Sequence, residues 1–288
     1  LSIERALSGP GSRDEVSWRR QVKVVAGGQG PGKRDQEALD RDRASLPLAG
    51  SYRIVVLGCT RGAGQTVTAL MTGHVLAVVR GIPVAALDLT SGPASLAARR
   101  PPPVSVQALF ADQAGQEADE HGARVDVVAD DGGDFRRLAD MLAERYPLTM
   151  IDPAPTGLTR VLARADQLVL VAPASPDAAT SLANTQQWLG AHGYGELAAR
   201  AVTVVNGVSR RTKDDVLRAE SVVRGRCRAI LRVPWDDLLS SRPGPIEQAT
   251  LQPQTRLAYT ALAGVLVTSL AATHVEPDPG RNLGEHAD

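Results

Sequence analysis

The residues best suited to chemistry lie in the stretch 53–70, RIVVLGCTRGAGQTVTAL. An apolar run of strand length leads into a turn that contains Gly62 and Gly64, and a helix-forming stretch follows. In such a turn, glycines let backbone N–H groups converge on a phosphate at the positive end of the helix, and a hydroxyl such as that of Thr66 reaches Mg²⁺. The stretch therefore predicts a phosphate-binding loop.

The loop departs from the pattern G-x-x-x-x-G-K-[ST] at two positions. Cys59 holds the place of the first glycine and Gln65 the place of the lysine. Lys23, Lys33 and Lys213 are the only lysines in the chain, so no nearby lysine replaces the missing one. A strand, a glycine turn and a helix also occur in ordinary βα connections, so the loop alone leaves both interpretations open.

Two aspartates follow apolar strand signals: Asp88 ends VAALD and Asp152 ends LTMID. Ligands collect beyond the carboxyl ends of parallel strands, so both carboxylates are expected to face the loop. We interpret Asp88 as the candidate catalytic residue that orients water, and Asp152 as a ligand to the Mg²⁺ water shell opposite Thr66. An aspartate that caps a strand-end turn is the alternative for each.

Two further side chains could contact a base. Asn206, in VTVVNGV, carries an amide with one donor side and one acceptor side, which suits an adenine edge. Trp235, in RVPWDD, could cover the base. The alternatives are an asparagine in a turn before glycine and a tryptophan in the core.

Composition narrows the classes of function. The chain has 288 residues, 43% of them hydrophobic, which suits one large α/β domain. Its 32 basic and 32 acidic residues balance, and Arg210, Arg211 and Lys213 make only a short basic cluster, so DNA is not an expected partner. Cys59 and Cys227 are too few for a disulfide framework. With no signal-peptide pattern and no long uninterrupted apolar run, we expect a soluble cytoplasmic protein.

Strand and helix signals alternate from residue 53 onward. Strands that are apolar on both faces and separated by helices indicate a parallel sheet covered on both sides. We therefore predict a three-layer α/β/α fold of the P-loop NTPase type, with a mostly parallel, twisted sheet of about seven strands. The expected strands are 54–57, 84–87, 125–128, 149–151, 167–171, 202–205 and 229–233, and the expected helices are 65–80, 135–145, 176–191, 214–224 and 253–272.

The two ends of the chain differ from the domain in composition and in apolar periodicity. Residues 1–50 mix charges with glycine and proline and lack an apolar period, so we expect a mostly disordered N-terminal arm, with the domain at 51–273 and a disordered tail at 274–288. The last helical stretch carries one basic residue, Arg256, whereas an interfacial helix needs a basic face. We expect it to pack on the sheet, without direct membrane insertion.

These features follow strand ends in the order that one family uses. The passages GCTRGAGQTVTAL, VAALDLTSGPASL, MIDPAPTGL with ADQLVLVAPAS, TQQWLGAHGYGELAARAVTVVNGVSRR and RCRAILRVPWD carry the likeness. Over about residues 51–272 the chain resembles the MinD/ParA-like P-loop proteins, the deviant Walker A or SIMIBI ATPases. Within that group it is most similar to MinD-like proteins of actinobacteria, including those associated with type VII secretion.

The resemblance implies ATP with Mg²⁺ as ligands and a homodimer formed over the nucleotide. The family loop K-G-G-x-G-K-T-T aligns with residues 60–67, so its first lysine, which reaches across the dimer, is Thr60 and its second is Gln65. In the family's Asp-x-Asp motif Asp88 is kept and Thr90 replaces the second aspartate, while Asp152 keeps the Walker B position. The nucleotide-binding positions implied are Thr60, Arg61, Gly62, Ala63, Gly64, Gln65, Thr66, Val67, Asn206 and Trp235.

Two classes of function follow. The first is an ATP-binding switch with weak or no hydrolysis, acting in cellular positioning or secretion-system assembly. The second is a pseudo-ATPase scaffold that binds protein partners of a secretion or cell-envelope assembly without nucleotide. Loss of both loop lysines argues against fast hydrolysis in either case, because a positive donor at the transferred phosphate is worth roughly 3 to 4 kcal/mol.

Overall fold

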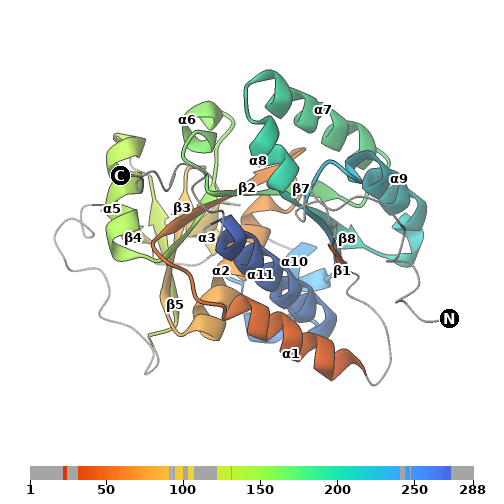
Figure 1. The fold of residues 1–288 in the computed structure, drawn as a ribbon, viewed down its shortest axis with the longest axis horizontal. Helices are drawn as coiled ribbons and strands as arrows, with labels where there is room; N and C mark the ends of the chain where they lie inside the picture. Colours follow the sequence, from red (N-terminus) through yellow and green to blue (C-terminus); the bar gives the residue numbers. More distant parts are fainter. Residues whose placement is uncertain are drawn as a thin grey trace, which may run out of the picture.

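The computed structural model describes residues 22–24, 32–90, 92, 95–99, 103–106, 122–130, 132–240, 244–246 and 248–273. At its centre lies a sheet in which every strand pair is parallel, with the order β1-β9-β8-β7-β2-β6-β3-β5-β4 (Figure 1). The strands are β1 (Val22–Val24), β2 (Tyr52–Gly58), β3 (Pro83–Asp88), β4 (Val104–Ser105), β5 (Arg124–Ala129), β6 (Leu148–Asp152), β7 (Gln167–Pro173), β8 (Val202–Val208) and β9 (Ala229–Pro234).

The predicted fold class is confirmed. All seven expected strands are present in the expected places, and the sheet adds β1 and β4 at its two edges. These two strands contain three and two residues, which is too short for an apolar run to reveal them in the sequence.

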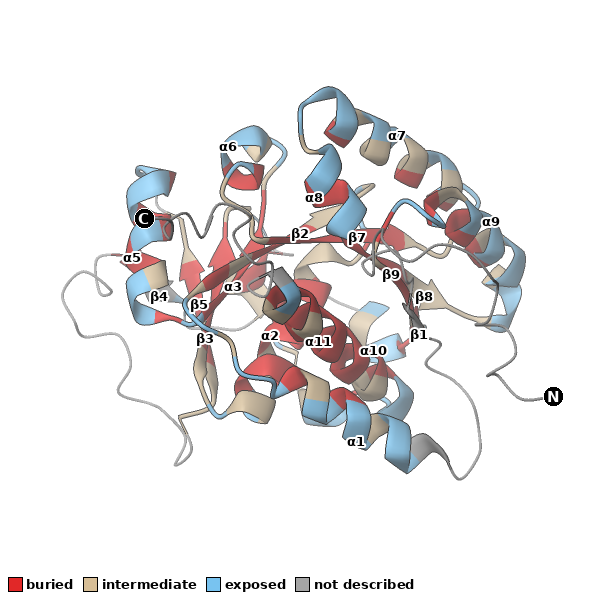
Figure 2. Cartoon of the chain, in the orientation of Figure 1, coloured by how far each residue is buried: buried red, intermediate tan, exposed pale blue. Residues whose placement is uncertain are grey.

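Helices cover both faces of the sheet, as its apolar strands require. Along β2, Ile54 and Val56 point into one buried cluster and Val55 into the other, because successive side chains of a strand alternate between faces. Figure 2 shows the buried residues on the sheet and α11 and the exposed ones on the outer sides of the helices. The first face holds α1 (Gly32–Ala44), α2 (Gln65–Arg80), α3 (Leu96–Arg99), α10 (Asp237–Ser240) and α11 (Pro253–Thr273), and the second holds α5 (Phe135–Arg145), α6 (Leu158–Leu162), α7 (Ala178–Ala191), α8 (Gly195–Arg200) and α9 (Lys213–Val223).

Two segments of the expected N-terminal arm are elements of this fold. β1 pairs with β9 in the register Val22 to Ala229, and α1 packs along α11. The α1–α11 contact is close: a Cβ on Gly264 would lie 2.7 Å from the carbonyl oxygen of Asp40. Because α1 packs through this backbone contact and not through a broad apolar stripe, its sequence lacks the period that would have predicted it. Residues 1–21, 25–31 and 274–288 lie outside the described part of the chain.

The last helix is held inside the domain. α11 is long and apolar enough by composition to cross a membrane, but 72% of that apolar window is buried. It contacts α1, α2 and β9, and Tyr259 and Leu262 are buried in the same cluster as the sheet residues. The helix therefore packs on the sheet, as the sequence predicts.

Candidate functional site

The predicted loop lies at the carboxyl edge of the sheet. β2 ends at Gly58 between β6 and β7, and α2 begins at Gln65. The loop turns through Gly64, whose φ of +92° lies in the left-handed region that favours glycine. No side chain caps the first turn of α2 at Gly64, so its N-terminal N–H groups are not covered by a capping oxygen. A helix start of this kind suits an anion.

Asn206 lies directly against this loop. Its amide nitrogen donates to the carbonyl oxygen of Ala63 at 3.1 Å. A Cβ on Gly64 would come within 1.9 Å of the same nitrogen, so the position requires glycine for space as well as for backbone angle. The structure thus brings the end of β8 to the loop, as strand-end placement predicts.

The side-chain amide of Gln65 makes hydrogen bonds within the protein through both its oxygen and its nitrogen. Its Oε1 accepts from the backbone N–H of Gly58 at 2.7 Å. Its Nε2 donates to the carboxylate of Asp152 and to the carbonyl oxygen of Pro153, the latter at 2.9 Å. The side chain that stands where the family has its second lysine therefore bridges the ends of β2 and β6.

Sequence reasoning did not foresee this bridge. The sequence predicts Gln65 only as a nucleotide-binding position in the place of the lysine. The available signal was chemical: a glutamine carries an acceptor as well as donors, so it can join an N–H group to a carboxylate, which a lysine cannot do.

Asp152 is fully buried. Burial raises the pKa of Asp152 to about 6, hydrogen bonding from Thr66 and Gln65 opposes the rise, and the charge of Asp88 adds to it. Its Oδ2 atom has no hydrogen-bond partner among the described residues. A buried carboxylate oxygen without a donor, beside the Thr66 hydroxyl, fits the water shell of a Mg²⁺ ion.

Asp88 lies next to Asp152 in the sheet register and is 2% exposed. Its Oδ1 accepts from the backbone N–H of Thr90 at 3.0 Å and from the Thr90 hydroxyl at 2.7 Å. Its Oδ2 accepts from the backbone N–H of Ala97 at 2.8 Å, in the first turn of α3. Both oxygens are thus used in local turn contacts, which is the geometry of the turn-capping alternative.

Trp235 follows β9 on the surface and is 52% exposed. Its ring lies 3.5 Å from the position that a Cβ of Gly207 would take, next to Asn206. Its Nε1 donates to Asp237 at 2.8 Å. The ring is therefore not a core side chain, and it stands where it could face a base beside Asn206.

The remaining predicted positions line the same loop. The Thr60 carbonyl oxygen accepts from the N–H of Ala63 at 3.3 Å, and Arg61 and Gly62 are exposed. Val67 is 6% exposed and belongs to the core cluster under α2. Among the described residues, no group of three or more His, Cys, Asp or Glu side chains is placed to hold a metal ion.

Comparison with known proteins gives relatives in sequence and in structure. No protein-family model matches the chain. It is 30% identical over 216 residues to the ESX-1 secretion-associated protein EspI of Mycobacterium tuberculosis (strain ATCC 25618 / H37Rv), covering 65% of this chain and 32% of EspI. The chain thus spans about a third of the length of that relative.

Two solved structures illustrate the fold. A ParA family ATPase from Chlorobium tepidum TLS superposes with a TM-score of 0.56 at 16% identity, covering 74% of this chain and 98% of that one. The MinC:MinD cell division protein complex of Aquifex aeolicus gives a TM-score of 0.53 at 15% identity, covering 81% and 99%. At such identities the likeness shows the fold, and it confirms the predicted resemblance at that level.

Proposed function

Because this chain has the fold of the ParA and MinD P-loop ATPases, we propose that it is a nucleotide-binding switch that takes ATP with Mg²⁺ and hydrolyses it weakly or not at all. The observation that carries the proposal is the glycine loop at the uncapped start of α2, which faces Asp152 with Gln65 in place of a lysine. The loop geometry supports binding, and the substitution argues against turnover.

The energetic reason is the missing charge. An ammonium group next to the β- and γ-phosphates offsets negative charge that grows during transfer, and removing one such donor typically slows the reaction about 10²- to 10³-fold. The Gln65 amide carries no charge, and its donors are already directed at Asp152 and Pro153. Nucleotide binding must therefore rely on backbone N–H groups and the start of α2.

Each remaining residue has a proposed role. Residues 60–67 would cradle the phosphates, while the Thr66 hydroxyl and Asp152 would hold Mg²⁺, the latter through water. Asp88 would orient the attacking water, and Asn206 and Trp235 would contact the base. A bound Mg²⁺ would supply charge neutralisation at the phosphates.

Arg61 is the proposed substitute for the missing charge. It lies in the loop, is exposed, and has no ion pair among the described residues. We expect Arg61→Ala to weaken ATP binding about 10-fold, as loss of a charged hydrogen bond does. Arg136→Ala, on the exposed start of α5, serves as the charge-matched control. Unchanged affinity in Arg61→Ala would refute this role.

The cellular role is inferred from relatives. EspI is described as secretion-associated, and the MinD structure holds a partner protein, MinC. We propose that this chain acts in the cytoplasm in positioning or secretion-system assembly, as a homodimer over nucleotide that binds protein partners. DNA binding and direct membrane insertion are not part of the proposal.

A pseudo-ATPase scaffold is the second candidate. The bridge from Gly58 through Gln65 to Asp152 favours it, because groups that would face phosphate and Mg²⁺ are bonded to each other. Such a loop could keep the fold rigid for a protein partner without nucleotide.

Equilibrium titration with a fluorescent ATP analogue separates the two candidates. Saturable binding that requires Mg²⁺ supports the switch, and the Asp152→Asn variant should then lose the Mg²⁺ dependence. No binding at millimolar nucleotide supports the scaffold. Phosphate release measured in parallel should stay near the background rate, and brisk turnover would contradict both.

A further inference from the structure

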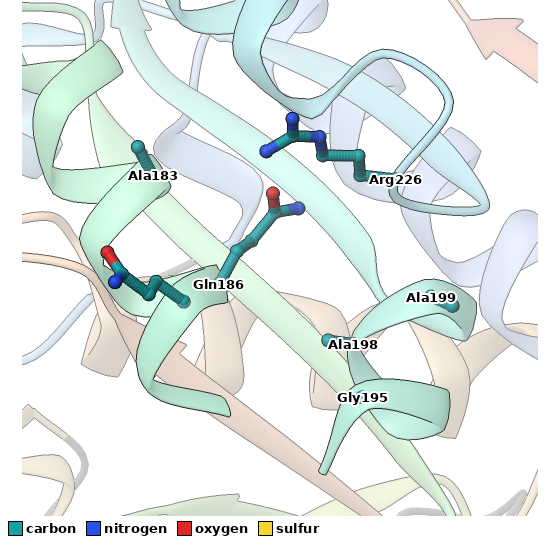
Figure 3. Close-up of a pocket in the computed structure, with 7 residues that line it drawn as sticks. Ala183, Gln186, Gly195, Ala198, Ala199 and Arg226 are labelled. Carbon is teal, nitrogen blue, oxygen red and sulfur yellow. The ribbon is translucent and has the colours of Figure 1, made fainter. Parts of the chain in front are cut away.

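A cavity lies between α7, α8 and the turn that connects α9 to β9 (Figure 3). Its volume is about 560 Å³. α8 leads into β8 and the turn leads into β9, so the cavity lies toward the amino ends of these strands, whereas the loop follows the carboxyl end of β2. It is lined by Ala183, Gln186, Gln187, Gly195, Ala198, Ala199 and Arg226.

Gln186 is the first sign that the cavity receives a ligand. Both its Nε2 and its Oε1 are buried, and neither has a hydrogen-bond partner among the described residues. A buried polar group left without a partner costs roughly 1 to 3 kcal/mol, so such groups usually meet one in the working state. An amide that offers a donor and an acceptor side by side matches a peptide bond.

Arg226 is the second sign. Its guanidinium and the Gln186 amide point toward one another across the cavity (Figure 3). No ion pair in the described part of the chain involves Arg226. Arg200, Arg224 and Arg228, which are close to the lining residues in sequence, also have no ion pair in the described part of the chain. The backbone N–H of Arg228 donates a hydrogen bond to the carbonyl oxygen of Ala201, at the end of α8, at 2.9 Å. Glu196 is the single acidic residue on α8.

The walls indicate the shape of the ligand. Ala183 lies on α7, and Gly195, Ala198 and Ala199 lie on α8, so small side chains line the cavity beside its three polar residues, Gln186, Gln187 and Arg226. Small residues let a main chain approach closely. A main chain that places one peptide bond at Gln186 and a carboxylate at Arg226 would satisfy both.

We propose that this cavity binds an extended segment of a protein partner, with an aspartate or glutamate carboxylate on Arg226 and an adjacent peptide bond on Gln186. The unpaired arginines supply charge complementarity to an acidic segment. A nucleic acid fits less well, because the Gln186 amide is buried and the acidic Glu196 follows the lining residue Gly195 in α8. The proposal is independent of nucleotide binding at the loop.

The test uses the full chain and pooled short peptides, blocked at both ends and fluorescein-labelled, with glutamate at a central position and all other positions varied. Fluorescence anisotropy should show binding of the glutamate pool, and about 10-fold weaker binding of pools with glutamine or lysine at that position. Arg226→Ala and Gln186→Leu should each weaken binding of the glutamate pool about 10-fold. Arg34→Ala, on the exposed face of α1, should leave it unchanged.

Several outcomes would overturn the proposal. Equal binding of the three pools would show that the cavity does not recognise a carboxylate, and full binding by Gln186→Leu with an unchanged melting temperature would show that the Gln186 amide takes no part. A short DNA duplex that displaces the peptide at equal concentration would assign the cavity to nucleic acid. Binding that occurs only after removal of residues 1–21 would show that this chain itself fills the cavity.

Discussion

At the residue scale, the bridge made by Gln65 decides what the loop can do. Replacing it with lysine removes the acceptor for the Gly58 N–H group and places an ammonium at the start of α2. We expect Gln65→Lys to bind ATP with Mg²⁺ about 10- to 100-fold more tightly than the natural chain, the range for a hydrogen bond to a charged group. Calorimetric titration measures this.

The control for that change is Gln65→Ala, which breaks the same bridge without adding charge. Its affinity should stay within a few-fold of the natural chain. An equal gain in both variants would mean that the bridge, and not the missing charge, limits binding.

The buried carboxyl of Asp152 predicts a pH dependence of stability in Mg²⁺-free buffer. Its pKa is raised to about 6 in the folded chain from an ordinary value near 3.8, so between these values the folded chain holds a proton that the unfolded chain releases. The free energy of unfolding should therefore fall as the pH rises from about 4 to about 6, by about 2 to 3 kcal/mol.

Asp152→Asn tests this directly, because the amide does not titrate. Urea unfolding should find the variant more stable than the natural chain above pH 6 and similar to it near pH 4. Asp177→Asn, at an exposed position before α7, should keep the pH profile of the natural chain. A natural chain whose stability does not change over this range would contradict the assignment.

At the element scale, the loop depends on how closely Asn206 approaches Gly64. Gly64→Ala meets both the left-handed backbone angle and the Asn206 amide 1.9 Å from the new Cβ. We expect a loss of more than about 2 kcal/mol in denaturant unfolding. Gly62→Ala has a similar φ of +77° with nothing within 4 Å, so it should lose only about 1 kcal/mol. Equal losses would mean that the loop and β8 are not packed as described.

The contact between α1 and α11 gives a second element-scale prediction. Gly264→Ala would place a Cβ 2.7 Å from the Asp40 carbonyl oxygen, which must separate the helices. We expect a loss of about 1 to 3 kcal/mol, as for overpacking. Gly190→Ala, in α7 with nothing within 4 Å, should instead gain about 0.5 to 1 kcal/mol. Thermal unfolding followed by circular dichroism compares the two, and a gain in Gly264→Ala would refute the contact.

At the scale of the whole molecule, the proposed switch would join two copies over nucleotide. The family lysine that reaches across the dimer is Thr60 here, so ATP with Mg²⁺ should shift the natural chain only weakly toward a dimer. The double variant Thr60→Lys/Gln65→Lys should dimerise more strongly, and the double variant with alanines should not. Sedimentation velocity with and without nucleotide measures this, and a strong ATP-dependent dimer of the natural chain would show that the lysines are not needed.

The regular elements could be predicted because each repeats a local pattern. The run 65–80 reads as a helix from its composition, and the structure begins and ends α2 at those residues. Val55 and Val56 are buried on opposite faces, so an unbroken apolar run alone indicates a doubly covered parallel strand. β1 and α1 escaped prediction because their pairing with β9 and α11 depends on residues some two hundred positions away.

By itself, the sequence determined the α/β order, the place of the loop and the strand-end positions of Asp88, Asp152 and Asn206, because these follow from local periodicity and from the rule that parallel strands end at one edge. Only the tertiary structure decided that Gln65 bonds to Asp152 and that Asn206 presses on Gly64. It also decided that Gln186 and Arg226 share a cavity. A hydrogen bond between distant strands forms only when the donor–acceptor distance is correct to within a few tenths of an ångström. The spacing of residues along the chain does not carry that information.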